Sequence, residues 1–298
     1  MSEPLFTGID QVAVVVEDAF ATAQYLCDHF GIGPWFHLQF GDAGDGNANW
    51  AAIDDCVTEG DPIGTYSIHC ICCSMPNGVE IEVISPIRGS SIFDRYLKRH
   101  GPGVQHVSIV LPDFDAAITR MKDAGFANGQ LATVDKTETC AFIDHLSAIG
   151  TYLELHKRPE VFVLPAIEMS YIPGPTADDL PARPKAFAQL ECINIATADL
   201  EASLAVMRDH YGFTDWTVTE NEKARTAYYG ALNIGIRISQ PKDPDSADAE
   251  AIAAHGTDIT SLSVSLDGEI SDIPLTAHDG GSFIDLKQIF GTELKVEP

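Results

Sequence analysis

The stretch IDQVAVVVEDAFATAQYLCDHFGIGPW, which starts at Ile9, decides the fold because the chain repeats it. It aligns without a gap with LECINIATADLEASLAVMRDHYGFTDW, which starts at Leu190. A fainter copy starts at Val104, and a fourth, which keeps the strand without a clear helix, starts at Asp258. Matches at many irregular positions indicate duplication, and a repeated unit decides the architecture before any single element does.

Each copy has the pattern of a strand, an acidic cap and a helix of about three turns that ends at glycine. Further strands are expected after the first helix at residues 50–53, 66–73 and 79–85, with a hairpin turn at 76–78. The repeated unit is therefore a βαβββ module. The sequence predicts an α+β fold of four tandem modules that pair into two half-open barrels with helices outside.

Length and composition fit two domains in an ordinary soluble protein. The chain has 298 residues, 45% of them hydrophobic, which is enough to bury a substantial core. We expect domains at residues 1–158 and 187–298, joined by a proline-rich linker at 159–186. The sequence has neither an apolar run of about 18 residues nor a signal-peptide pattern, so a cytoplasmic location is expected.

The net charge and the cysteine content limit the classes of partner that this protein can bind. The formal net charge of −26 argues against nucleic acids and anionic membranes, because both would be repelled. The seven cysteines include Cys70, Cys72 and Cys73 in one apolar stretch, which favours reduced, buried thiols over disulfides. This cluster could bind a metal, but no second Cys or His pair at zinc-finger spacing accompanies it. The expected partner is a small-molecule substrate, and a homodimer is compatible with the sequence.

Four strand-like stretches each place one metal-capable residue at an equivalent position: Gln11, Glu82, His106 and Glu154. Successive side chains of a strand point to opposite faces. Glu80 shares the face of Glu82, and the opposite face of these strands is entirely apolar. One face is therefore expected to be core, and the other to line a polar site.

Three stretches within residues 8–158 resemble the vicinal oxygen chelate superfamily, which contains glyoxalase I, methylmalonyl-CoA epimerase, extradiol dioxygenases and bleomycin resistance proteins. The stretches are GIDQVAVVVED, EIEVISPIRGSSIFDRYLKRHGPGVQHVSIVLPDFDAAITRMKDAGF and CAFIDHLSAIGTYLELHKRP. Their closest local likeness is to methylmalonyl-CoA epimerase and its relatives. The second half resembles the superfamily only at the level of the module.

The resemblance implies one divalent metal ion held between paired modules by Gln11, Glu82, His106 and Glu154. The epimerases usually have His at the first position, so Gln11 is a departure. An amide oxygen can nevertheless bind a hard or borderline ion, and the set resembles that of some glyoxalase I enzymes. Zinc, cobalt, nickel, manganese and magnesium would all suit it.

Several other residues near these positions could line the site or lie elsewhere in the fold. Glu80 and His156 are expected beside the metal rather than on it. His69 precedes the hairpin, and its face depends on the register of that turn. His145 is expected at the surface, and Trp35 and Trp50 are expected in the core or at the pocket wall.

The second half lacks the ligand set. Cys192, Arg237 and Ser261 occupy the first three equivalent positions, and the fourth is Lys295 or Glu293. This half is expected to close the pocket, shape substrate selection or mediate dimerisation. Arg237 would hold an anionic substrate group or pair with a carboxylate.

The family likeness and the donor set together predict a metal-dependent isomerase or epimerase, or a lyase. Such an enzyme removes a proton α to a carbonyl and stabilises the enolate with the metal. Glu154 and Glu82 are the candidate bases, with Glu80 or His69 for the opposite face of the substrate. The substrate would carry vicinal oxygens, and only the family likeness suggests a CoA thioester.

Two other classes of function stay open. An Fe(II) extradiol dioxygenase would use two His and one carboxylate, whereas only one of the four positions is His. A metal-free binding or resistance protein would use the same cleft without needing the ligand set. Metal content separates the binding protein from the enzymes, and oxygen dependence separates the dioxygenase from the isomerase.

Overall fold

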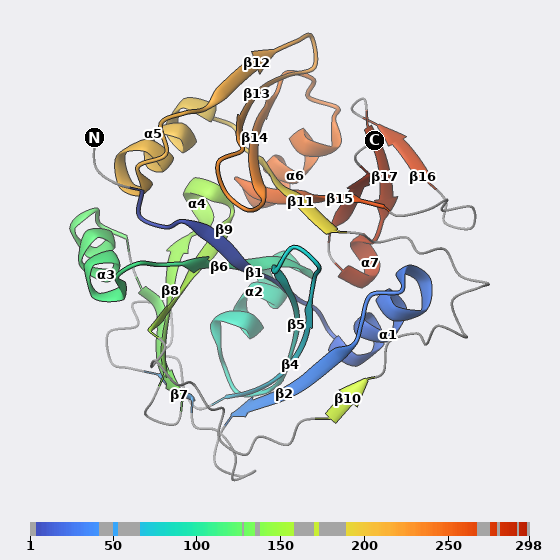
Figure 1. The fold of residues 1–298 in the computed structure, drawn as a ribbon. Helices are drawn as coiled ribbons and strands as arrows, with labels where there is room; N and C mark the ends of the chain where they lie inside the picture. Colours follow the sequence, from blue (N-terminus) through green and yellow to red (C-terminus); the bar gives the residue numbers. More distant parts are fainter. Residues whose placement is uncertain are drawn as a thin grey trace.

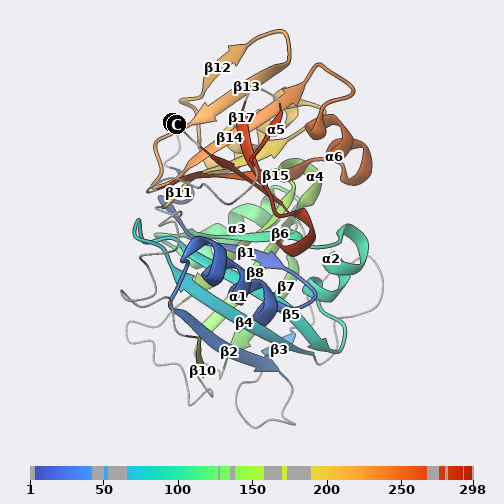
Figure 2. The same ribbon diagram turned by 90° about the vertical axis from the view of Figure 1, so that its right-hand side faces the viewer.

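The computed structural model describes residues 4–41, 50–52, 66–126, 128–134, 138–157, 170–172, 189–266, 275–278, 281–290 and 292–296. Each half of the chain forms one mixed β-sheet, and the second half stacks on the first (Figures 1 and 2). The expected α+β architecture of paired βαβββ modules is confirmed. No helix within the described ranges is long and apolar enough to cross a membrane.

The sheet of the first half has ten strands and curls around a helix (Figure 1). Its strands are β1 (Gly8–Val15), β2 (Trp35–Gly41), β3 (Trp50–Ala52), β4 (Ser67–Ser74), β5 (Glu80–Arg88), β6 (Gly103–Val110), β7 (Asn128–Val134), β8 (Glu138–His145), β9 (Thr151–Lys157) and β10 (Ser170–Ile172). They lie in the order β10-β2-β4-β5-β1-β6-β9-β8-β7-β3. The antiparallel pair β1–β6 joins the first module to the second.

The sheet of the second half has eight strands. These are β11 (Gln189–Ala196), β12 (Thr217–Glu220), β13 (Ala224–Tyr229), β14 (Gly235–Pro241), β15 (Asp258–Ser265), β16 (Leu275–His278), β17 (Gly281–Asp285) and β18 (Glu293–Val296). Their order, β12-β13-β14-β11-β15-β18-β17-β16, repeats the pairing of the first half around β11 and β15. The segment 267–274, where the fourth module would have its helix, lies outside the described residues.

Seven helices are described. They are α1 (Ala19–Phe30), α2 (Ile92–His100), α3 (Phe114–Asp123), α4 (Leu146–Ile149), α5 (Leu200–Tyr211), α6 (Ala247–His255) and α7 (Lys287–Phe290). Asp18, Asp113 and Asp199 cap α1, α3 and α5, each accepting a backbone N–H three residues on. Gly31 and Gly212 end α1 and α5 in the left-handed conformation, as the sequence predicts.

The second strand of the first module was expected at residues 50–53, and this position is wrong. That strand is β2, which begins at Trp35 soon after α1 and pairs with β4. Residues 50–52 instead form the short β3 at the opposite edge of the sheet, paired with β7. The alternation of Phe36, Leu38 and Phe40 with polar residues is a period-two signal that marks β2 in the sequence.

The proline-rich stretch between the halves contributes one strand. Residues 170–172 form β10, which pairs antiparallel with β2 at an edge of the first sheet. Residues 158–169 and 173–188 lie outside the described ranges. The domain boundaries drawn from the sequence stay a prediction.

One apolar core joins the two halves. Side chains from the outer face of the first sheet, such as Val107 and Leu153, enclose a small apolar space together with Ile193 and Ile259 of the second sheet. Asn233 fastens the contact, because its side chain accepts from Ile9 N at 2.9 Å and donates to Ile9 O at 2.7 Å. Burial of this face fits the hydrophobic effect as the main source of stability.

The cysteines of the described ranges are buried and outside any disulfide, as expected: Cys27, Cys70, Cys72, Cys73, Cys140 and Cys192. Cys56 lies outside those ranges. Cys70 and Cys72 point to the concave side of the first sheet, whereas Cys73 belongs to the core on the other side. The three thiols therefore do not converge on one metal ion.

Candidate metal centre

Three strands bring the expected ligands to the concave face of the first sheet. In register, Ala13 of β1 stands between Glu82 of β5 and His106 of β6. Glu154 of β9 is paired with Ser108, two residues along β6 from His106. Because Ala13 has only a methyl side chain, the longer side chains of its neighbours can reach toward one another over it.

The imidazole of His106 lies between the two carboxylates. Its Nε2 atom is 3.4 Å from Glu82 Oε2 and 3.3 Å from Glu154 Oε2. The exposed fractions are 8% for Glu82, 1% for His106 and 4% for Glu154, so all three are buried. Buried charged groups need partners or a bound ion, which makes this cluster a candidate cation site.

The mutual pairing shifts the pKa values of His106 and of Glu154. Burial by itself lowers the pKa of His106, but Glu154 and Glu82 outweigh it and raise the pKa to about 9. Burial opposes ionisation of Glu154, but His156 and His106 outweigh that effect and lower its pKa well below the usual range. The Glu154 carboxylate therefore stays charged and attracts a cation, either the imidazolium itself or a metal ion.

Gln105 orients the His106 ring. Nδ1 of His106 lies 2.6 Å from Gln105 Oε1, an atom that only accepts hydrogen bonds. Nδ1 therefore carries the hydrogen, and Nε2 is the nitrogen that faces the carboxylates. A hydrogen bond to the second ring nitrogen is the usual support of a metal-binding histidine.

Hydrogen bonding leaves part of this cluster unsatisfied. His106 Nε2 and Glu154 Oε2 are buried but have no hydrogen bond of good geometry, although they lie within ion-pair distance. Buried polar atoms are nearly always satisfied in folded proteins. A divalent cation between them would satisfy both atoms, and one imidazole with two carboxylates is a suitable donor set for it.

Gln11 lies beside this cluster. It is on the concave face, in register with Glu80 on one side and Ser108 on the other. Its amide nitrogen donates a hydrogen bond to Glu80 Oε1 at 2.7 Å. The structure thus gathers three of the four expected ligands and directs the fourth toward Glu80.

Residues 10–140 match the Glyoxalase/Bleomycin resistance protein/Dioxygenase superfamily. The matched residues make up most of the first half of the chain. The vicinal oxygen chelate resemblance seen in the sequence is thereby confirmed. Among curated proteins, none matches the sequence significantly.

Two of the solved structures that match this chain cover more than nine tenths of it. A mutant 4-hydroxymandelate synthase from Streptomyces coelicolor is 11% identical, with a TM-score of 0.62 over 98% of this chain and 92% of its own. A fusion of a xylose isomerase-like TIM barrel with a 4-hydroxyphenylpyruvate dioxygenase has 11% identity and a TM-score of 0.51, over 91% of this chain and 39% of its own. Methylmalonyl-CoA epimerase from Mycobacterium tuberculosis has 21% identity and a TM-score of 0.37, over 53% of this chain and 93% of its own. At these identities the first two structures show a similarity of fold alone.

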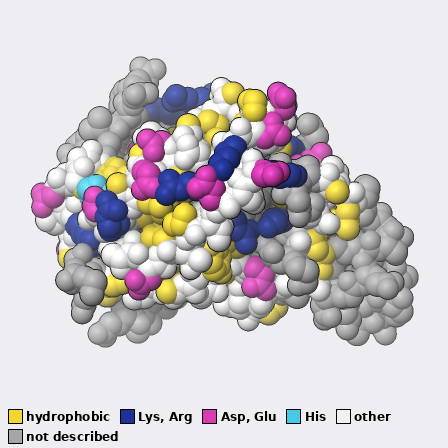
Figure 3. Space-filling model, turned by 90° about the horizontal axis from the view of Figure 1, so that it is seen from above, with side chains coloured by type: hydrophobic (Ala, Val, Ile, Leu, Met, Phe, Trp, Pro, Cys, Tyr) yellow, Lys and Arg dark blue, Asp and Glu magenta, His cyan; other side chains and the backbone are white. Residues whose placement is uncertain are grey.

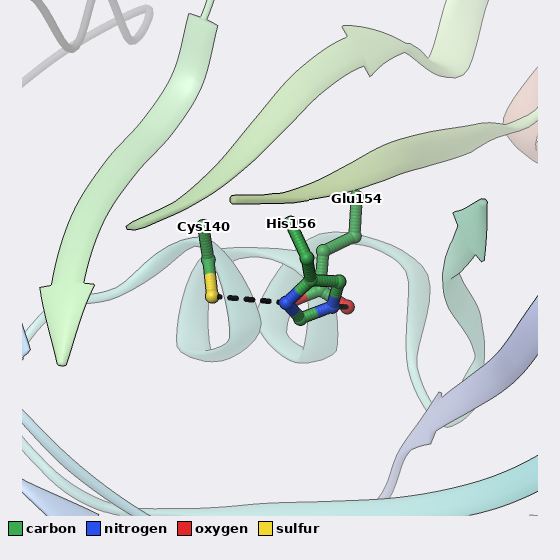
Figure 4. A group of neighbouring side chains, drawn as sticks. All are labelled: Cys140, Glu154 and His156. Carbon is green, nitrogen blue, oxygen red and sulfur yellow. Dashed lines mark hydrogen bonds and ion pairs between the residues drawn. The ribbon is translucent and has the colours of Figure 1, made fainter. Parts of the chain in front are cut away.

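Members of the superfamily commonly bind a divalent metal, and a second group of possible ligands adjoins the first in this chain. Glu154 Oε2 is 3.0 Å from His156 Nε2, and His156 Nδ1 is 3.3 Å from Cys140 Sγ (Figure 4). The ligand atoms of these three residues all lie within 4.8 Å of one another. Glu154 is therefore shared by two overlapping sets of donors.

Cys140 is the residue that sequence reasoning missed. It lies opposite His156 in the β8–β9 pair, and the nearest signal is the alternation that puts His156 on the face of Glu154. The partner strand of His156 becomes known only with the register of the sheet. His156 was expected beside the metal, and its contact with Glu154 is compatible with that place or with a direct bond to the ion.

The structure overturns His69 as a candidate base. Cys70 and Cys72, its neighbours on β4, face the concave side, so His69 points to the opposite face of the sheet. There its Nδ1 lies 2.9 Å from His37 Nε2, and its ring contacts Phe20 of α1. The side to which His69 points is set by the β4–β5 register, which the sequence leaves undetermined.

His145 and Trp35 are both buried in the structure. His145 is 1% exposed rather than at the surface, because it packs on Phe126 and its Nε2 lies 2.6 Å from the Tyr211 hydroxyl of the second half. Trp35 is fully buried in the core and is not a pocket wall. The side chain of Trp50 lies outside the described residues.

Aromatic side chains wall the cluster on the inside of the barrel. The ring centroids of Phe93 on α2 and Phe142 on β8 lie 6.0 Å and 5.1 Å from that of His106. The side chains of Glu82 and His156 keep 11% and 14% of their surface exposed, so the cluster reaches solvent on their side. Apolar walls lower the local dielectric and strengthen the interaction of the carboxylates with any cation.

The thiols of Cys70 and Cys72 remain protonated. Burial, together with Glu82, raises the pKa of Cys70 and of Cys72 well above the usual value. A thiol must lose its proton to act as a nucleophile or as a strong metal ligand. These two cysteines therefore belong to the wall of the site.

Proposed function

We propose that the first half binds one divalent metal ion through Glu82, His106 and Glu154 and catalyses proton transfer α to a carbonyl group. The reaction class is isomerisation or epimerisation, or a related lyase reaction. The observation that carries the proposal is the position of His106 Nε2, which is buried within 3.4 Å of two carboxylates without a satisfactory hydrogen bond. Membership of a superfamily that includes epimerases and dioxygenases supports it.

The protein groups have distinct roles in this proposal. When bound, the ion would supply Lewis-acid stabilisation for negative charge on vicinal substrate oxygens. Gln105 would hold the His106 ring in place through Nδ1. Glu154, Glu82 or Glu80 would accept the α-proton, and Glu80 is the one outside the His106 cluster. Phe93 and Phe142 would keep water from the reacting carbon.

Two residues are candidates for the fourth ligand of the ion. Gln11 is the one implied by the superfamily positions, and its amide oxygen would bind the ion if the side chain turned from Glu80. His156 is the other, since its Nε2 already lies 3.0 Å from Glu154 Oε2. The substrate would be a small molecule with vicinal oxygens, entering on the exposed side between Glu82 and His156.

We also propose a cytoplasmic location. The described cysteines are free and buried, which suits a reducing compartment.

Elemental analysis of tag-free protein tests the metal. We expect about one divalent ion per chain in the wild type, and its loss in both His106→Ala and Glu154→Ala. The control is His69→Ala, which removes an imidazole from the opposite face of the same sheet and should retain the ion. Wild-type protein that takes up no metal even after reconstitution would refute the proposal and favour a metal-free binding protein.

A second candidate function follows from His156. Two imidazoles and one carboxylate are the donors of non-haem Fe(II) oxygenases, and His106 and His156 both lie within 3.3 Å of Glu154 Oε2. Only one of the four expected ligand positions is His, but His156, which the sequence places beside the metal, supplies a second imidazole. Oxygen uptake by the Fe(II)-loaded protein with catechols or 2-oxo acids, lost in His156→Ala, would favour a dioxygenase over an isomerase.

A further inference from the structure

The concave face of the second sheet encloses a cavity of about 280 Å³. This cavity is lined by strands β11, β13, β14, β15 and β18 and by the start of α6. Its volume is at the lower end of the range of small-molecule sites, about 300–1,000 Å³. The cavity occupies the same place in the second half as the cluster of Glu82, His106 and Glu154 occupies in the first half.

Strand registers identify which residues take the place of the metal ligands. Asn194 of β11 pairs with Arg237 and Ser261, as Ala13 pairs with Glu82 and His106. Ser263 then pairs with Lys295, as Ser108 pairs with Glu154. The fourth equivalent position is therefore Lys295, not Glu293. The substitutions replace both carboxylates of the cluster by cations.

Arg237 is oriented by a buried polar network. Its Nη1 atom donates to Asn194 Oδ1 at 2.6 Å and to Ser263 Oγ at 3.3 Å. Asn194 in turn donates to Ser261 Oγ and to Ser263 Oγ, each at 3.0 Å. Asn194, Ser261 and Ser263 are all buried, so the guanidinium is held in a defined position at the cavity wall.

The charge balance of this cavity differs from that of the chain. Arg237, Lys295 and Lys223 line it together with Asp248 and Glu293. Glu293 Oε1 is already 3.2 Å from the ammonium of Lys287, outside the cavity lining. The whole chain has 18 basic and 44 acidic residues, so a lining with more cations than anions is a local reversal. On the outer surface seen in Figure 3, basic side chains lie among acidic ones.

The two halves also differ in how far a helix fills the concave face. In the first half, α2 buries Ile92, Phe93 and Tyr96 against it. The corresponding helix of the second half, α6, has no buried side chain. Helix α6 therefore does not fill the concave face of the second sheet, and the cavity lies there.

We propose that this cavity binds a small carboxylate-bearing molecule, with Arg237 and Lys295 as its charged contacts. The planar guanidinium matches a carboxylate through paired N–H donors, and the hydroxyls of Ser261 and Thr226 line the same space. The site does not depend on the metal centre of the first half. A second-half site for an anion would serve to select a substrate or to sense an effector.

Isothermal titration of the full-length protein with acetate, malonate and benzoate, at constant ionic strength, tests the proposal. At least one carboxylate should bind saturably to the wild type. Arg237→Gln and Lys295→Gln should each raise its Kd about tenfold or more, because a charge-assisted hydrogen bond contributes about 1.5–3 kcal/mol. Arg225→Gln is the matched control, because Arg225 lies on β13 outside the cavity lining and pairs with Glu201 at 2.6 Å.

Three results would overturn the proposal. They are the absence of saturable binding of any of the three carboxylates, an equal loss of binding in Arg225→Gln, and tighter binding of sulfate than of each carboxylate. Thermal unfolding of each variant verifies that it folds. Arg237→Lys keeps the charge without the planar fork and should weaken binding less than Arg237→Gln does. Because metal content is not a readout here, failure of the metal proposal leaves this test intact.

Discussion

The two halves of this protein share one topology and one strand register, yet their concave faces have opposite chemistry. In the first half, Glu82, His106 and Glu154 form a buried anionic cluster around an imidazole. In the second half, the same positions are Arg237, Ser261 and Lys295 on the wall of a cavity. Backbone pairing therefore preserves positions, whereas the side chains at those positions decide what the face can bind.

The two halves also differ in whether the helix before the second module, α2 or α6, fills the concave face of the sheet. Gly103 starts β6 with no side chain, and an added Cβ would lie 2.8 Å from the Tyr96 hydroxyl of α2. That close approach lets α2 settle on the concave face. The equivalent position in the second half, at the start of β15, is Asp258, and α6 packs there without burying a side chain.

The largest effect that we expect is on the free energy of unfolding, when a side chain of α2 is removed from the concave face of the first sheet. Phe93→Ala should lower the free energy of unfolding by about 3–5 kcal/mol, because a fully buried aromatic ring is removed. Ile252→Ala on α6, where no side chain is fully buried, should cost less than about 1.5 kcal/mol. Urea denaturation of both variants measures the contrast, and equal losses would show that α6 packs as tightly as α2.

The next effect concerns the charge at the fourth position of each half. Glu154→Gln keeps the shape but removes the charge, and should weaken metal binding more than about 100-fold, since groups that only orient a ligand already contribute 10–100-fold. Lys295→Gln, at the equivalent position of the second half, should leave metal affinity unchanged. Competition with a chelating dye gives both values. A comparable loss in Lys295→Gln would place the metal in the second half instead.

A smaller effect is expected from pH at Asp258, where burial raises the carboxyl pKa to about 7 against the opposing hydrogen bond from Ile259 N. The folded state then keeps a proton that the unfolded state loses at lower pH. The stability from this group is complete below the unfolded pKa, about 4, and is lost as pH rises through about 7. Asp258→Asn stays neutral and keeps the acceptor oxygen.

At pH 8 Asp258→Asn should therefore be more stable than the wild type by about 1–2 kcal/mol, since partial exposure reduces the full effect. The gain should shrink as pH falls toward 4. Thermal unfolding from pH 4 to pH 8 gives the profile. A constant difference across that range would mean that ionisation of Asp258 is not its cause.

The smallest expected effect is at Gln11, the ligand position that the structure directs toward Glu80. Gln11→Ala should weaken metal binding by about tenfold or less, because a neutral amide contributes less than a carboxylate. His156→Ala, measured in the same way, decides between the two possible fourth ligands. The residue whose removal has the greater effect is the one that binds the ion.

The sequence was a good guide to the repeated unit and to the faces of its strands. The period-two pattern of β5, β6 and β9 correctly separated a polar face from an apolar one, because alternation along a strand needs no knowledge of its neighbours. The capped helices and their terminal glycines followed from local chemistry in the same way. The sequence misplaced the strand that follows α1, because it predicted this strand at residues 50–53 and β2 begins at Trp35.

The sequence by itself determined that Glu82, His106 and Glu154 share a face and that the second half has lost them. Only the tertiary structure decided that His69 points away, that Cys140 adjoins His156, and that Lys295 rather than Glu293 is the fourth equivalent residue. These results depend on register between strands that are distant in the chain. Register is set by turns and by packing across the whole sheet, and a shift of one residue reverses every side chain.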